Sequence, residues 1–204
     1  MGTAREEILN KLKKAVHPEP EKPDFDAPVY HSIKKPLELA FKENLETVNG
    51  SVYLFNSKKE LTEKMQKFLS GYRPENICCK EPELQKHLSE QNIRFSECPD
   101  LPETIEVGIT SCEFLIAHTG SIMVSSAQKG GRQLFVYPPI HIVIAQKKQV
   151  VDYLEAAYSG IQNKYTENLP SQITLITGPS RTADIEKTLI LGAHGPRELH
   201  VFIY

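Results

Sequence analysis

The chain lacks any apolar run near the about 18 residues that a membrane-spanning helix needs. Its first segment, MGTAREEILNKLKKAV, lacks the apolar core of a signal peptide and the hydroxyl residue that completes a myristoylation pattern. The formal net charge of −2 provides no general positive field for nucleic acid or anionic lipid. We therefore expect a cytoplasmic protein with no membrane span and no nucleic-acid partner.

Cysteine is scarce and is not arranged as a ligand set. The four cysteines, Cys78, Cys79, Cys98 and Cys112, include no CxxC pair, and the neighbours Cys78 and Cys79 diverge if they lie in a strand. We predict buried, unreactive thiols and no metal or cofactor bound by this chain alone. His141, between two isoleucines, is interpreted as a hydrogen-bonded core histidine. The motifs GxGxxG, GxxxxGKS/T and HExxH are absent, so dinucleotide, P-loop and zinc-protease sites lack direct support.

Proline and charge divide the chain near residue 36. Residues 5–16 carry an apolar stripe at helical spacing, whereas residues 17–36 contain five prolines and form an extended connector. We predict an N-terminal helical arm with its connector over residues 1–36 and a single domain over residues 37–204. The arm packs either on its own domain or on a partner.

Helices and strands alternate along the domain, which is typical of an α/β fold with a mostly parallel sheet flanked by helices. The expected helices cover residues 37–48, 57–70, 82–91, 147–163 and 182–191. The expected strands cover residues 51–55, 77–79, 94–95, 119–125, 133–137, 140–145, 173–177 and 199–204. Short strands near Gly130-Gly131 indicate a local antiparallel excursion, and residues 173–204 indicate a right-handed βαβ unit.

The loop between the expected strand 173–177 and the expected helix 182–191 is the strongest candidate site. A helix start offers unpaired N–H groups and a positive dipole end, and an arginine there can grip a carboxylate or phosphate. The residues concerned are Gly178, Ser180, Arg181, Thr182 and Asp184. The alternative is that the hydroxyl residues only cap the helix and the acid only interacts with its dipole.

A second candidate site lies in GITSCEFLIAHTGSIMV, residues 108–124. Glu113 is expected to open a short helix, and His118 lies in the turn with Thr119 and Gly120. This spacing allows an acid–base pair between Glu113 and His118, although helix capping explains Glu113 as well. His194 is another candidate base, but its loop lies by default at the opposite edge of a parallel sheet from Ser180.

The chain resembles the LUD domain of the LutC/YkgG lactate-utilisation family over roughly residues 37–204. The resemblance rests on three motifs: GITSCEFLIAHTGSIMV, PPIHIVIA and TGPSRTADIEKTLILGAHGPRELHV. The resemblance implies a fold similar to the NagB/RpiA/CoA-transferase-like proteins. It also implies a role in oxidising L-lactate to pyruvate beside two iron–sulfur proteins, so that the clusters lie in partner subunits. Many members carry an acid where this chain has His118, and a histidine there titrates nearer neutrality.

Three functions follow from these observations. In the first and preferred one, the chain is a subunit of an iron–sulfur-dependent lactate-oxidation system, with Arg181 as carboxylate clamp and His194 or His118 as base. In the second, it is an autonomous transferase or isomerase for an anionic small molecule or CoA ester, with Glu113 or Glu186 as nucleophile or base. In the third, it is a non-catalytic assembly module. The number of copies stays open, and a homo-oligomer is compatible with each.

Overall fold

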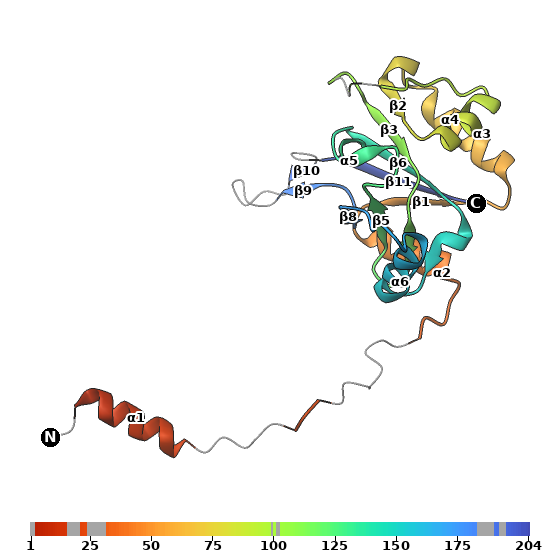
Figure 1. Ribbon diagram of the computed structural model, residues 1–204. Coiled ribbons are helices and arrows are strands. Elements are labelled where there is room, and N and C mark those ends of the chain that lie inside the picture. The colour runs from red at the N-terminus through yellow and green to blue at the C-terminus, as the bar shows by residue number, and fades with distance from the viewer. Residues whose placement is uncertain are drawn as a thin grey trace. The chain divides into compact units, whose positions relative to one another are not determined.

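The computed structural model describes residues 3–15, 21–23, 32–98, 100, 103–182, 190–191 and 195–204. The chain divides into two units, Met1–Ser32 and Ile33–Tyr204 (Figure 1). The first unit contains helix α1 (Ala4–Lys14), which confirms the predicted N-terminal helix. Acidic residues lie in its first turn and lysines in its last, as the helix dipole favours. Its apolar stripe of Ile8, Leu9 and Leu12 is exposed.

A five-stranded parallel sheet forms the centre of the second unit, with the strand order β1-β11-β6-β3-β2. These strands are β1 (Ser51–Leu54), β2 (Ile77–Cys79), β3 (Val107–Thr110), β6 (Ile140–Ala145) and β11 (Glu198–Ile203). All six residues of β6 and five of the six in β11 are buried. Such continuously buried strands are expected where both faces of a parallel sheet are covered.

Helices α3 (Lys58–Leu69) and α4 (Pro82–Glu90) cover one face of this sheet. Ser57 begins α3 by accepting a hydrogen bond from the backbone N–H of Glu60, as its sequence predicts. The 3-10 turn η1 (Pro74–Asn76) leads into β2. The apolar residues of both helices and of this sheet face form one buried cluster, in which each fully buried large side chain contributes roughly 1.5–3 kcal/mol.

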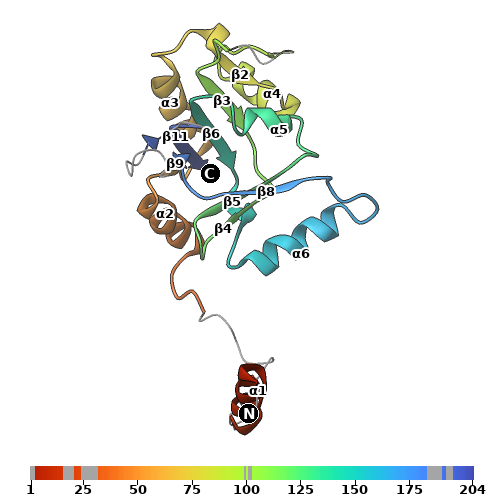
Figure 2. The same cartoon turned by 90° about the vertical axis from the view of Figure 1, so that its left-hand side faces the viewer.

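A second sheet and helix α2 (Leu37–Thr47) cover the other face. The strand order of the second sheet is β7 (Val150–Val151), β4 (Phe114–Ile116), β5 (Ser121–Ser125) and β8 (Ile173–Ile176). Its β4–β5 and β5–β8 pairs are antiparallel, and β4–β7 is parallel. Helix α6 (Leu154–Lys164) packs on its outer face (Figure 2). No helix in the described part of the chain is long and apolar enough to cross a membrane.

The α/β class and the mostly parallel sheet are confirmed, and the antiparallel part is a separate sheet. The predicted strand 133–137 is wrong, because helix α5 (Gly131–Leu134) occupies this stretch. A short apolar run does not distinguish strand from helix. The predicted helix 147–163 begins later, after the 3-10 turn η2 (Lys147–Gln149) and strand β7. Residues 94–95 form no strand, and only the neighbouring Ser96 bridges to the main sheet.

The predicted helix 182–191 is wrong at both of its described ends, because Thr182 and Ile190–Leu191 lie in strands. Strand β9 (Arg181–Thr182) pairs antiparallel with strand β10 (Ile190–Leu191), and residues 183–189 lie outside the described part. The predicted βαβ unit therefore does not form, since β8 and β11 belong to different sheets. Local capping signals favoured a helix, but the strand pairing is a tertiary contact that propensity does not encode.

Candidate functional site

A cleft of about 690 Å³ lies at the carboxyl edge of the main sheet, between α4 and the second sheet. Ser111 follows β3, Gln146 follows β6, Tyr204 follows β11, and Glu81 immediately precedes α4. All four line the cleft, together with the lysines Lys58, Lys86, Lys148 and Lys164. Ligands of open α/β sheets bind at this edge, so the cleft is the best-placed site in the described part of the chain.

Glu113 is the centre of one buried polar network in the cleft wall. Its carboxylate accepts hydrogen bonds from the hydroxyl of Ser125 at 2.6 Å, the hydroxyl of Tyr165 at 2.9 Å and the ammonium of Lys164 at 2.7 Å. The Glu113 side chain has no exposed surface, whereas that of Lys164 is 55% exposed. Burial alone would lower the pKa of Lys164, but the hydrogen bond and charge of Glu113 raise it above its ordinary value. The Lys164 ammonium therefore keeps its proton at pH 7.

The phenol of Tyr165 belongs to the same network. Burial raises the pKa of Tyr165, and its hydrogen bond to Glu113 raises it further. The phenol therefore remains a proton donor to the carboxylate. Because Lys164 ends α6 and Tyr165 follows it, these bonds hold the end of α6 against the start of β4.

Glu81 forms a second network around Ser111, two residues before Glu113. Its carboxyl accepts the backbone N–H of Ser111 at 2.8 Å and also the Ser111 hydroxyl. The side-chain amide of Gln128 donates to this hydroxyl at 2.9 Å. Burial raises the pKa of Glu81, although the two Ser111 bonds act in the opposite direction. This carboxyl therefore holds a proton more readily than an ordinary glutamate.

The segment Ser111-Cys112-Glu113 joins the two networks, and the amide of Gln149 fixes it by donating to the Cys112 carbonyl at 2.6 Å. At Ser111 the segment contacts the Glu81 carboxyl, whose pKa is raised, and at Glu113 it contacts the Lys164 ammonium. Together these groups can bind a small carboxylate and move a proton at a neighbouring hydroxyl.

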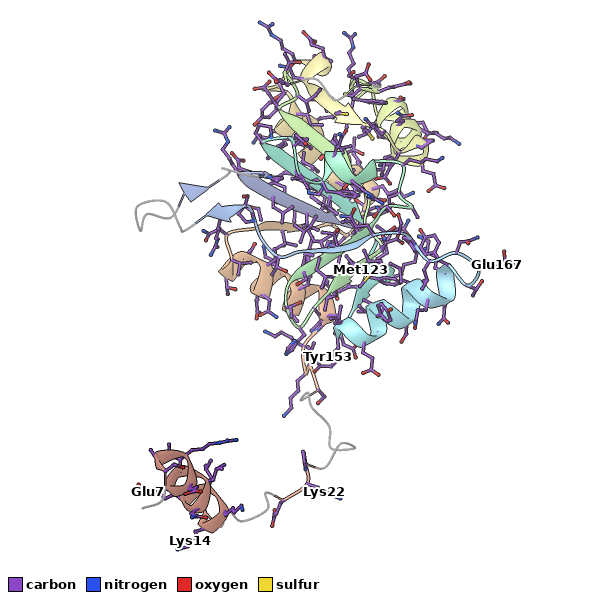
Figure 3. All side chains as sticks on the ribbon, turned by 60° about the vertical axis from the view of Figure 1, so that its left-hand side comes forward. Glu7, Lys14, Lys22, Met123, Tyr153 and Glu167 are labelled. Atoms are coloured by element: carbon purple, nitrogen blue, oxygen red, sulfur yellow. The ribbon has the colours of Figure 1, made fainter. Side chains whose placement is uncertain are left out.

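The structure does not bring Glu113 and His118 together. Glu113 does not open a helix; it precedes β4, and His118 lies just beyond the other end of that strand. Five extended residues span about 16 Å, so the proposed acid–base pair is not formed. His118 is exposed, with its ring centroid 5.1 Å from that of Tyr153. In Figure 3, Tyr153 and Glu167 mark the two ends of α6, so this turn and the Lys164 network are apart.

Thr119 and Gly120 lie in the turn at the tip of the β4–β5 hairpin. The Thr119 hydroxyl is 2.7 Å from that of Ser121, which is 2.7 Å from that of Thr177. The predicted site residues at this turn and after β8 are therefore neighbours. Gly120 has a φ of +64°, and a Cβ there would lie 2.4 Å from the backbone nitrogen of Leu45. This close packing fixes the turn on the end of α2.

The loop after β8 does not present an anion site at a helix start, because no helix begins at Thr182. A Cβ on Gly178 would lie 2.6 Å from the carbonyl oxygen of Val48, and the Ser180 N–H donates to the Pro196 carbonyl at 2.8 Å. The loop is thus packed against its own chain. Arg181 is exposed in β9.

Two of the predicted site residues have no described position in the structure. Asp184 and His194 lie outside the described residues, as does Glu186.

His141 is a buried core residue. Its Nε2 lies 2.8 Å from the hydroxyl of Thr110, but its Nδ1 has no hydrogen-bond partner among the described residues. Burial lowers the pKa of His141 to about 4. The histidine is therefore neutral at pH 7.

All four cysteines are free and buried. Burial raises the pKa of Cys79 to about 12, and it also raises the pKa values of Cys78 and Cys112. The thiols of Cys78, Cys79 and Cys112 are therefore protonated, and the prediction that the cysteines are buried is confirmed. Within the described ranges, no three His, Cys, Asp or Glu side chains converge as a metal-binding group.

Sequence reasoning missed Glu81, Lys164 and Tyr165. A signal for Glu81 was present, since it follows the apolar strand Ile77–Cys79 and so lies at the carboxyl edge of the sheet. Lys164 and Tyr165 gave no comparable signal. They are 51 and 52 positions from Glu113, and only the packing of α6 brings them to it.

Comparisons with known proteins agree with this architecture. "Lactate utilization protein C" of Oceanobacillus iheyensis is 26% identical over 198 residues, 96% of this chain and 78% of that protein. The protein of the same name from Bacillus subtilis is 35% identical over 109 residues, 52% of this chain and 43% of that protein. The chain thus spans less than half the length of several curated relatives that it matches.

A solved structure has the same fold. The crystal structure of a DUF162 family protein from Deinococcus radiodurans superposes with a TM-score of 0.61 at 19% identity, covering 82% of this chain and 95% of that one. The family model of the LUD domain matches residues 96–204, more than half of the chain. This segment includes Ser111, Glu113 and Lys164 of the cleft. The chain belongs to the LUD domain family.

Proposed function

We propose that this chain acts in lactate utilisation as a subunit that binds a small hydroxy acid, L-lactate or the product pyruvate, in the cleft at the carboxyl edge of the main sheet. The names of the relatives support the pathway. The observation that carries the site is the pair of networks on Ser111 and Glu113, which tie the Glu81 carboxyl and the Lys164 ammonium to residues two positions apart in the cleft wall.

The geometry suits a three-carbon hydroxy acid. Ser111 and Glu113 are two positions apart, so their Cα atoms are separated by at most about 7 Å. A ligand carboxylate that accepts from Lys164 can therefore extend its hydroxyl toward Ser111 and Glu81. Lys164 has three ammonium donors and is only half buried, so its bond to Glu113 leaves donors for a ligand.

Oxidation of lactate to pyruvate breaks the hydroxyl O–H bond and the Cα–H bond and releases two electrons. In this proposal Glu81 accepts the hydroxyl proton, directly or through Ser111, and Lys164 holds the carboxylate. The Cα hydrogen and the electron pair pass to an acceptor carried by iron–sulfur partner proteins, as the family resemblance implies. Anion binding at the loop after β8 forms no part of the proposal.

Calorimetric titration with L-lactate and pyruvate tests the site. Lys164→Met is expected to weaken binding by about 1.5–3 kcal/mol, the range of a charge-assisted hydrogen bond. Lys67→Met, an exposed lysine in α3 away from the cleft, is the matched control and should leave the affinity unchanged. If the folded Lys164→Met variant binds L-lactate as tightly as the wild type, L-lactate does not bind in this cleft.

A growth assay tests the pathway. The gene for this chain is expressed in a Bacillus subtilis strain that lacks its own lactate utilization protein C, and growth on L-lactate is compared with growth on glucose. Rescue by the wild-type chain but not by Glu81→Gln supports the proposal. Turnover of CoA esters by the isolated chain, without rescue, would favour the autonomous transferase instead.

A further inference from the structure

The outer edge of strand β8 is unpaired among the described residues, since β8 pairs only with β5. The Ser126 N–H donates to the Gln172 carbonyl at 2.9 Å, which fixes the alternation of the antiparallel ladder. Thr174 and Ile176 therefore point their backbone groups at β5. The N–H and C=O groups of Ile173, Leu175 and Thr177 point the other way, and no described residue bonds to them.

The sequence of this edge has none of the usual protection against pairing. Residues 172–180, QITLITGPS, contain no charge, and no proline lies within β8 itself. Leu175 is 44% exposed although it lies directly opposite Met123, which is 1% exposed beneath α6. Natural edge strands commonly carry lysine, proline or a bulge, so an uncharged edge with an exposed leucine indicates a binding edge.

The other edge strands of the two larger sheets, β7, β2 and β1, are short or already bonded. Strand β7 has only two residues. Ser96 bonds to the edge of β2 on either side of Cys78. The Cys79 N–H donates to the Ser96 carbonyl, and the Ser96 N–H donates to the Ile77 carbonyl. At β1, the ammonium of Lys42 donates to the Val52 carbonyl at 2.8 Å. The contrast singles out β8.

We propose that a second copy of this chain pairs its β8 with this edge, antiparallel and about a two-fold axis at Leu175. The outward-facing residues then form the hydrogen-bonded pairs: Leu175 with Leu175 of the second copy, and Ile173 with Thr177 of the second copy. The two second sheets become one continuous eight-stranded sheet, and the exposed leucines cover each other.

Symmetry favours this occupant. With the axis at Leu175, each outward-facing residue of one copy meets a residue of the same edge in the other, so backbone donors and acceptors match. The flanks carry mixed charge, since exposed Glu167 lies before β8 and exposed Arg181 after it, while Arg132 donates to the Ser171 hydroxyl at 2.7 Å. The edge is therefore complementary to itself in backbone groups and apolar surface.

Sedimentation velocity of the full chain at about 50 μM tests the proposal. The expected mass is twice the chain mass of 23.0 kDa. Leu175→Lys opposes two like charges across the axis and should return the mass to that of a single chain. Leu39→Lys is the matched control, because Leu39 is similarly exposed at 41% but lies in α2, and it should leave the dimer intact.

A cross-link gives an independent measurement of the register. Paired Cα atoms about 5.5 Å apart are within reach of a disulfide, so Leu175→Cys treated with oxidised glutathione should form a covalent dimer. Leu39→Cys should not, and the four native cysteines are buried. A single-chain mass for the wild type, or a dimer that survives Leu175→Lys in folded protein, would overturn the proposal.

Discussion

Strand β4 has a polar region at each end, and the two regions differ in their burial and in the residues that surround them. At one end, Glu113 is fully buried, bonded to Lys164, and lines the cleft. At the other end, His118 is exposed in a turn that packs on α2. The two residues are five positions apart in the sequence. The comparison teaches that burial beside charged partners, rather than the presence of an acid and a histidine in one motif, identifies the region with chemical potential.

The turn region is expected to be structural, and its glycine gives the largest effect. Gly120→Ala combines a φ of +64° with a Cβ 2.4 Å from the Leu45 nitrogen, which should cost about 4 kcal/mol of unfolding free energy. Gly131→Ala is the control, since its φ is +65° but its Cβ would meet open space, and it should cost about 1 kcal/mol. Urea denaturation measures both. Equal losses would show that strain alone fixes the turn.

The core of the main sheet should carry a pH dependence through His141 of β6, which bonds to Thr110 of β3. Burial lowers the pKa of His141 to about 4 from an ordinary value of 6.5. Between these values the unfolded chain binds the proton and the folded chain does not, so stability falls as the pH falls. The full loss below pH 4 is about 3 kcal/mol.

His141→Gln cannot titrate and should lack this contribution. The difference in unfolding free energy between wild type and variant is measured from pH 7 to pH 4. It should move in favour of the variant as the pH decreases. A constant difference would contradict the buried neutral histidine.

Removing the Glu113 carboxylate should have the next largest effect on the free energy of unfolding. Glu113→Ala leaves the donors of Ser125, Tyr165 and Lys164 without their acceptor, and we expect a loss of about 2 kcal/mol because Lys164 is partly solvated. His118→Ala, at the exposed end of β4, should cost about 0.5 kcal/mol. Denaturation of the two variants compares the two ends directly, and a reversed order would break the comparison.

Arg181→Ala should have the smallest effect. Arg181 is exposed in β9, and its neighbour Thr182 belongs to the same strand and not to a helix start. We expect its loss to change stability by less than about 0.5 kcal/mol and to leave L-lactate affinity as it is. Calorimetry and denaturation check both values. Weakened ligand binding would return the site to the loop after β8.

The sequence predicts the fold class and most of its elements because their signals are local. Alternation of strand and helix, the Ser57 cap and the apolar strand IHIVIA all act within a few residues. The helix expected at 182–191 is wrong at its described ends for the complementary reason, since Arg181 pairs with Leu191 across nine intervening positions. The second sheet is likewise assembled from segments far apart in the chain.

The candidate site follows the same rule. Glu113 could be singled out from its motif, but its partners Lys164 and Tyr165 come from the end of α6, and Glu81 comes from the start of α4. Only the packed structure unites them. Conversely, the sequence motif after β8 resembles an anion site, but in the structure the Ser180 N–H donates to the Pro196 carbonyl.

The most direct test is a crystal structure of this chain soaked in oxamate, a stable analogue of pyruvate with the same carboxylate. The account predicts ligand density in the cleft, with the carboxylate on the Lys164 ammonium and the amide end toward Ser111 and Glu81. Ligand density beside the hydroxyls of Thr119 and Thr177, or on Arg181, would contradict it. An empty cleft at saturating oxamate would contradict it as well.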